Sequence, residues 1–93
     1  RGSFGRLFCR KEMAAAGVAH EIVQINHSCT AKAGTIRGLH FQRPPATETK
    51  VIRCVHGAVW DVAVDLRAGS PTFLQWRAVE LRADQPAMIV IPD

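Results

Sequence analysis

Alternation of apolar and polar residues is clearest in the middle of the chain, where it predicts a β-hairpin. Residues 50–55 and 58–65 alternate on either side of His56-Gly57, and two such runs around a short turn are typical of a hairpin. A two-residue turn pairs residue 52 with residue 61, which makes Lys50 and Asp61 diagonal neighbours on one face. The spacing therefore places these two side chains within reach of a salt bridge.

Weaker patterns on both sides of this hairpin predict further short elements. Residues 8–16 are good helix formers and end at Gly17, so we expect a short helix there. Strands are expected over residues 21–28, 35–42, 73–81 and 87–93. Trp60 and Trp76 are expected to pack in the core or on the sheet. Many short strands with one small helix near the start indicate an all-β protein, an antiparallel sandwich or barrel in a single domain.

Length and composition limit the size of the core. The chain has 93 residues, of which 47% are hydrophobic and 22% charged, as in an ordinary folded protein. A chain of this length forms at most one domain and buries only a little over ~60% of its unfolded surface. Because residue 1 is Arg rather than Met, and the apolar run at residues 87–93 has no closing element after it, we expect a part of a longer protein.

The charge favours anionic partners, and the cysteines exclude two kinds of site. The formal net charge is +4, which suits a nucleotide, a sugar phosphate or nucleic acid. The basic residues are scattered, so no nucleic-acid partner is expected. Three cysteines without C-x-x-C spacing argue against a disulfide framework or a zinc site. The apolar runs are too short to span a bilayer and no signal peptide opens the chain, so a cytoplasmic protein without a membrane partner is expected.

His40 is the first candidate for chemistry. It lies on the same predicted strand as Arg37, and a base beside an anion-binding guanidinium is a plausible active-site pair. The alternative is a surface histidine with an arginine in an ordinary ion pair. Gly34 and His40 are spaced as at the start of a metal-cupin motif, but Gln42 replaces its second histidine. Because His40 and Glu48 alone would hold a metal poorly, a metal-free site is favoured.

Two other polar groups have both a structural and a chemical interpretation. Lys50 on the concave side of a barrel could stabilise an enolate, or it could form an exposed salt bridge with Asp61. Gln24 and Asn26 share a polar strand face, which is either half solvated or the lining of a polar pocket. No P-loop, G-x-G-x-x-G or G-x-S-x-G motif occurs.

Several motifs, in order and at matching spacing, closely resemble the dTDP-4-dehydrorhamnose 3,5-epimerase family. They are Arg1-Gly2-Ser3-Phe4, Gln24-Ile25-Asn26, Gly34 to Gln42, Lys50, Gly57-Ala58-Val59, Asp61 to Arg67, Gly69-Ser70-Pro71-Thr72 and Trp76. The resemblance covers essentially all of the chain. It implies a cupin-type jelly-roll barrel, usually a homodimer, that inverts C3 and C5 of a nucleotide-linked 4-keto-6-deoxysugar in deoxysugar biosynthesis, with neither metal nor cofactor.

The resemblance also implies roles for single residues. His40 matches the base that removes the proton next to the ketone, Arg37 and Lys50 match residues that hold the substrate and stabilise the enolate, and Asp61 supports Lys50. The remaining matches are substrate contacts: Gln24, Ile25 and Asn26 on one strand, and Arg1 and Phe4 near the nucleotide.

The chain also departs from the family pattern. Arg6 stands where the family usually has Glu, and the family's second histidine, its tyrosine acid and the aspartate that orients the base come after the equivalent of Asp93. Two alternatives are therefore kept: a truncated, non-catalytic cupin that binds a sugar nucleotide, and a metal-dependent cupin oxygenase or isomerase.

Overall fold

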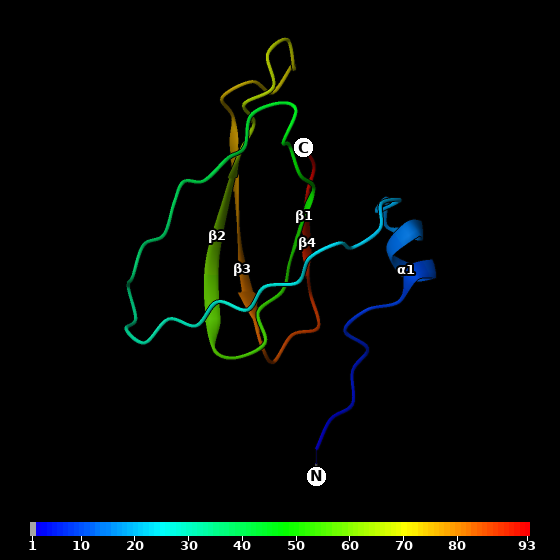
Figure 1. Cartoon of the computed structure of the whole chain (residues 1–93). Coiled ribbons are helices and arrows are strands. Elements are labelled where there is room, and N and C mark those ends of the chain that lie inside the picture. Colours follow the sequence, from blue (N-terminus) through cyan, green and yellow to red (C-terminus); the bar gives the residue numbers. More distant parts are fainter. Residues whose placement is uncertain (1) are drawn as a thin grey trace. The chain divides into compact units, whose positions relative to one another are not determined.

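The chain divides into two compact units, Arg1–Ala46 and Thr47–Asp93. The structure, a computed structural model, describes residues 2–93. In the first unit the regular element is a short helix, and the second unit carries four strands (Figure 1). The all-β class with a short N-terminal helix and antiparallel pairing is therefore confirmed. The helix described has six residues and is far too short to cross a membrane.

The helix α1 spans Arg10–Ala15 and begins two residues later than expected. Gly17 follows the C-cap residue Ala16, and its φ of 92° lies in the left-handed region that glycine adopts without strain. The Gly17 amide donates to the carbonyl of Ala14 and the Val18 amide donates to the carbonyl of Met13. These two bonds form a Schellman motif. Met13 and Val18, the residues that such a motif brings together, are both buried.

The expected strands over residues 21–28 and 35–42 are wrong. Both segments have an open backbone path that pairs with no strand among residues 2–93 (Figure 1). Alternation shows which side chains could share a face, but a strand also needs a neighbour that accepts and donates its backbone hydrogen bonds. His40 and the segment Gln24 to Asn26 therefore lie on irregular backbone.

The second unit contains two antiparallel strand pairs. β1 (Lys50–Ile52) pairs with β4 (Ile89–Ile91), and β2 (Ala58–Val64) pairs with β3 (Trp76–Arg82). These strands lie inside the expected runs, except that β3 extends one residue further. Their pairing differs from the expectation: the hairpin between residues 50–55 and 58–65 is wrong.

The pairing error has a local cause. The β1 strand ends at Ile52, and a bend over residues 55–57 leads the chain into β2 without folding it back onto β1. The carbonyl of Gly57 accepts a hydrogen bond from the Ala83 amide at 2.9 Å. This bond connects the bend to the end of the β2–β3 pair. Buried Cys54 adds a bond from its thiol to the carbonyl of His56.

The loop that joins β2 to β3 is organised around Asp65. Its carboxylate accepts bonds from the hydroxyls of Ser70 and Thr72, each at 2.6 Å. The guanidinium of Arg67 adds two more bonds, at 2.9 and 3.0 Å. The side chains of Arg67, Ser70 and Thr72 hold the pKa of Asp65 far below its usual range, because each stabilises the charged form. The expected loop over residues 67–72 is confirmed as a tightly bonded turn.

The buried side chains of the second unit lie around β3. Leu81 is 1% exposed and Cys54 is 9% exposed. In contrast, Trp60 and Trp76 are each 65% exposed, so of the two expected positions, the core or the sheet, the core is wrong: both lie on strands of the sheet. They occupy the face of the β2–β3 pair opposite to Leu81, since Val59 pairs with Leu81 and side chains alternate along each strand.

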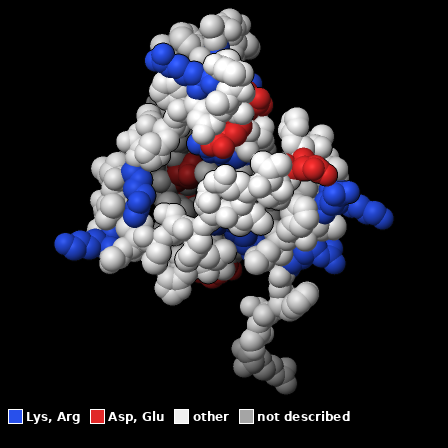
Figure 2. All heavy atoms as spheres, in the orientation of Figure 1, with Lys and Arg blue, Asp and Glu red and all other residues white. Residues whose placement is uncertain are grey.

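Charged side chains are distributed over the surface. Figure 2 shows Lys and Arg at separate places on the visible face, with Asp and Glu between some of them. No single-sign block of the kind that marks a nucleic-acid footprint is seen on that face.

Candidate functional site

His40 is an exposed residue of the first unit, and its backbone and ring lie close to Gly38. Gly38 has a φ of 101°. A Cβ atom at this position would lie 3.2 Å from the backbone nitrogen of His40 and 3.4 Å from its Nδ1 atom. Glycine is therefore favoured here for two reasons, the left-handed backbone and the close approach of the His40 backbone nitrogen.

Arg37 is held by the segment that precedes it. Its Nε donates to the Thr30 hydroxyl at 3.4 Å and one terminal nitrogen donates to the carbonyl of Cys29 at 3.3 Å. Both bonds are long for N–H···O geometry, and no acidic partner is found for this guanidinium among residues 2–93. Arg37 thus remains able to bind an anion.

The other predicted contacts of the first unit are exposed. Phe4 is 98% exposed and Ile25 is 87% exposed, and Gln24 and Asn26 are exposed as well. Arg1 lies outside the described residues. The polar face expected from Gln24 and Asn26 is thus solvent-exposed in the chain as described.

Lys50 opens β1 and is half-buried. Its ammonium lies 3.4 Å from a carboxylate oxygen of Glu48, two residues earlier and hence on the same side of an extended chain. In the sheet Lys50 pairs with Ile91, so the salt bridge expected with Asp61 from the hairpin register is wrong: the ion pair found for Lys50 among the described residues is with Glu48.

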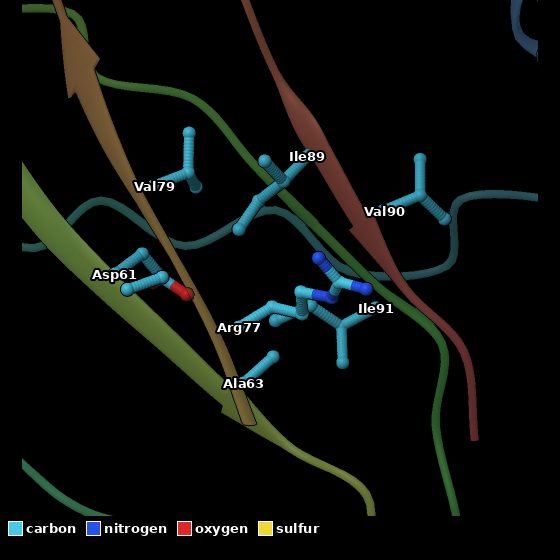
Figure 3. A pocket seen from close by; sticks show the side chains of 8 residues that line it. Asp61, Ala63, Arg77, Val79, Ile89, Val90 and Ile91 are labelled. Carbon is cyan, nitrogen blue, oxygen red and sulfur yellow. The ribbon is translucent and has the colours of Figure 1, made fainter. Parts of the chain in front are cut away.

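Asp61 lines a cleft of about 230 Å³ in the second unit. The cleft lies between the β2–β3 pair and β4, and Figure 3 shows Asp61, Ala63 and Val79 on one side with Ile89 and Ile91 on the other. Asp61 is half-buried there. A carboxylate at an apolar wall can orient a cation or a polar ligand, because the interaction is stronger where water is reduced.

Arg77 is a site residue that the sequence interpretation missed. It lies opposite Ala63 in the β2–β3 pair and lines the same cleft as Asp61. The sequence contained a pattern that could have identified it: along residues 77–81, Arg77 shares its face with apolar Val79 and Leu81. Arg77 itself is exposed, so what the sequence could have shown is the face that it shares with Val79 and Leu81, and not its burial.

No metal centre is assembled within residues 2–93, where no three His, Cys, Asp or Glu side chains come together as ligands. His40 belongs to the first unit and Glu48 to the second.

Comparison with known proteins gives one consistent result. The family model described as dTDP-4-dehydrorhamnose 3,5-epimerase matches residues 1–93. A curated dTDP-4-dehydrorhamnose 3,5-epimerase from Sinorhizobium fredii is 44% identical over 96 residues, which cover 99% of this chain and 47% of the relative. The enzyme of the same name from Shigella flexneri is 46% identical over 94 residues, covering 100% of this chain and 51% of the relative.

A solved structure agrees with the sequence relatives. The crystal structure of dTDP-4-dehydrorhamnose 3,5-epimerase from Bacillus anthracis, with TDP and PPi bound, superposes with a TM-score of 0.92 at 48% identity. The match covers 96% of this chain and 51% of that chain, and it confirms the expected cupin-type fold. This chain spans about half the length of the curated relatives it matches.

Proposed function

Since the chain belongs to the dTDP-4-dehydrorhamnose 3,5-epimerase family, we propose that it acts in the epimerisation of a nucleotide-linked 4-keto-6-deoxysugar at C3, C5 or both. The observation that carries this proposal is the family match over all 93 residues. The superposition on a solved epimerase, at a TM-score of 0.92, supports it. We include in the proposal a single cupin-type domain over residues 1–93, a homodimer and a cytoplasmic location.

In the proposed reaction His40 is the general base. A hydrogen on the carbon next to the C4 ketone is acidic, because the electron pair left behind moves onto the ketone oxygen as an enolate. His40 takes that proton, and return of a proton to the opposite face of the carbon inverts it. Gly38 supports this role, since it places no side chain next to Nδ1, from which a Cβ there would lie 3.4 Å. A positioned base of this kind contributes about 10²- to 10⁴-fold to the rate.

Arg37 and Lys50 supply positive charge in the proposal. An enolate forms at a useful rate only where its charge is stabilised by fixed donors or cations. Arg37 has no acidic partner among the described residues, and Lys50 keeps its ammonium beside Glu48 at 3.4 Å. We assign Asp61 a supporting role within the second unit. The chain contains no tyrosine, so a phenolic proton donor does not come from these residues.

The nucleotide and sugar contacts are assigned to the first unit. We assign Gln24, Ile25 and Asn26 to the sugar, and Arg1 and Phe4 to the nucleotide. The exposure of Phe4 and Ile25 supports this assignment, because apolar side chains that face solvent are available to cover a ligand.

Deuterium exchange tests the proposed function. The chain is incubated in D₂O with a thymidine-diphosphate 4-keto-6-deoxyhexose, and mass spectrometry measures deuterium at the carbons next to the ketone. We expect exchange that falls by about 10²-fold or more in His40→Ala. The control variant is His20→Ala, which removes another exposed histidine of the same unit and should leave exchange unchanged.

The same experiment distinguishes an epimerase from the alternative, a non-catalytic cupin that binds a sugar nucleotide. If the sugar nucleotide binds by calorimetry but no deuterium enters the wild-type chain, these residues form a non-catalytic cupin. Exchange that continues undiminished in His40→Ala would remove His40 as the base.

A further inference from the structure

Arg77 lies on the face of the β2–β3 pair that lines the cleft. It is opposite Ala63, and Asp61 is opposite Val79. Directly opposite residues of an antiparallel pair project to the same face, and side chains alternate along each strand. Arg77 therefore shares its face with Leu81, which is 1% exposed. Arg77 itself is exposed, so its guanidinium is accessible to a ligand that enters the cleft from solvent.

Within the part of the chain that the structure describes, no carboxylate satisfies the Arg77 guanidinium. Arg82, on the same strand, binds Asp84 through two nitrogens at 3.0 and 3.1 Å. Arg77 makes no ion pair of this kind, although Asp61 is its diagonal neighbour. In Figure 3 the guanidinium of Arg77 extends toward β4 and away from the Asp61 carboxylate. Its N–H donors thus face the cleft.

The cleft fits one group of a ligand. Its volume of about 230 Å³ is below the ~300–1,000 Å³ of pockets that enclose whole drug-sized molecules. Ile89 and Ile91 form its apolar wall, which strengthens any charge interaction by reducing local solvent. Asp61 repels an anion on its own side, so the favourable position for an anion is next to Arg77 and β4.

We propose that Arg77 binds a phosphate group of the sugar-nucleotide substrate in this cleft. The proposal rests on the proposed function, because that function supplies a substrate with a diphosphate. The planar guanidinium presents two parallel N–H donors that match two phosphate oxygens, which an ammonium cannot do. Arg77 is thus a substrate-binding residue in addition to those expected from the sequence.

Calorimetric titration with thymidine diphosphate tests this role. The wild-type chain is compared with Arg77→Gln, Arg77→Lys and Arg82→Gln. We expect Arg77→Gln to weaken binding by about 10- to 100-fold, the loss typical of a hydrogen bond to a charged group, and Arg77→Lys to weaken it less. Arg82→Gln removes the same charge from the same strand but from the opposite face, and should change the affinity less than about twofold.

Four results would count against the assignment. Equal weakening by Arg77→Gln and Arg82→Gln would mean that only net charge matters. Unchanged affinity with a lowered melting temperature in Arg77→Gln would make Arg77 a structural partner of Asp61, and Asp61→Asn should then restore the melting temperature. If the wild-type chain and Arg77→Gln bind thymidine diphosphate equally well, the proposed phosphate contact of Arg77 is wrong, but the proposed epimerase function is not affected. No binding by the wild-type chain would refute both.

Discussion

Gly38 allows the position of His40 to be tested with one added methyl group. In Gly38→Ala the new Cβ would lie 3.2 Å from the His40 backbone nitrogen and 3.4 Å from Nδ1. The 3.2 Å contact is tight enough to push the His40 backbone away by a few tenths of an ångström, whereas 3.4 Å to Nδ1 is an ordinary van der Waals contact. The backbone adds strain, since a φ of 101° is unfavourable by about 1–2 kcal/mol for a residue with a Cβ.

Gly34 provides the matched control for this change. It also has a positive φ, of 77°, but a Cβ there would meet nothing within 4 Å. Gly34→Ala and Gly38→Ala therefore carry similar backbone strain of about 1–2 kcal/mol, and only Gly38→Ala also displaces the His40 backbone, which carries the imidazole with it. The difference between the two variants isolates the contact with His40.

The deuterium-exchange rate and the imidazole nuclear magnetic resonance signals measure that difference. A misplacement of about 1 Å can reduce a rate by about 100-fold, so a shift of a few tenths should lower exchange by about three- to tenfold in Gly38→Ala. Gly34→Ala should keep the wild-type rate. The reasoning would be refuted if both variants exchanged equally and the His40 signals did not move.

Three further changes test the packing and the loop. Leu81→Ala should lower the free energy of unfolding by about 2–5 kcal/mol in urea titrations, because Leu81 is 1% exposed, whereas Val59→Ala on the opposite strand should lower it less, because Val59 is 42% exposed. Gly17→Ala should lower helicity by circular dichroism and destabilise the chain by about 1 kcal/mol, since Gly17 has a φ of 92°. The lowered pKa of Asp65 means that its contribution to stability is present above its unfolded value near 3.8 and is lost as the pH falls below that value. Melting temperatures from pH 6 to pH 2 should therefore fall less steeply in Asp65→Asn than in the wild type, and an unchanged slope would contradict the loop geometry.

Local chemistry was predictable from the sequence wherever a few neighbouring residues decide the structure. Gly17 ends α1 because a left-handed residue is needed two positions after the last helical one. The turn at residues 67–72 forms because Asp65 has hydroxyl and guanidinium donors within seven positions. Both features depend on contacts between residues close in sequence, so a pattern in the chain is sufficient to find them.

Exposure was less predictable than turns. Trp60 and Trp76 have the large apolar side chains that are typical of core residues, but each is 65% exposed. The residue type sets how much free energy burial would provide, whereas the fold decides which face of a sheet is covered. A large aromatic side chain on a strand therefore identifies the strand without identifying its buried face.

In β2, the face on which a side chain lies can be inferred from that strand alone, whereas its cross-strand neighbour depends on which strand pairs with β2. Alternation along β2 put Asp61 and Ala63 on one face, and both line the cleft; that inference needs only the period of a single strand. The neighbour of Asp61 depends on which second strand pairs with β2, and β3 takes that place instead of β1. The same single-strand argument applied to β3 puts Arg77 on the face of Leu81 before any pairing is known. For strand residues in this chain, the face on which a charge lies is thus the stronger sequence-based guide to function, and its partner has to come from the structure.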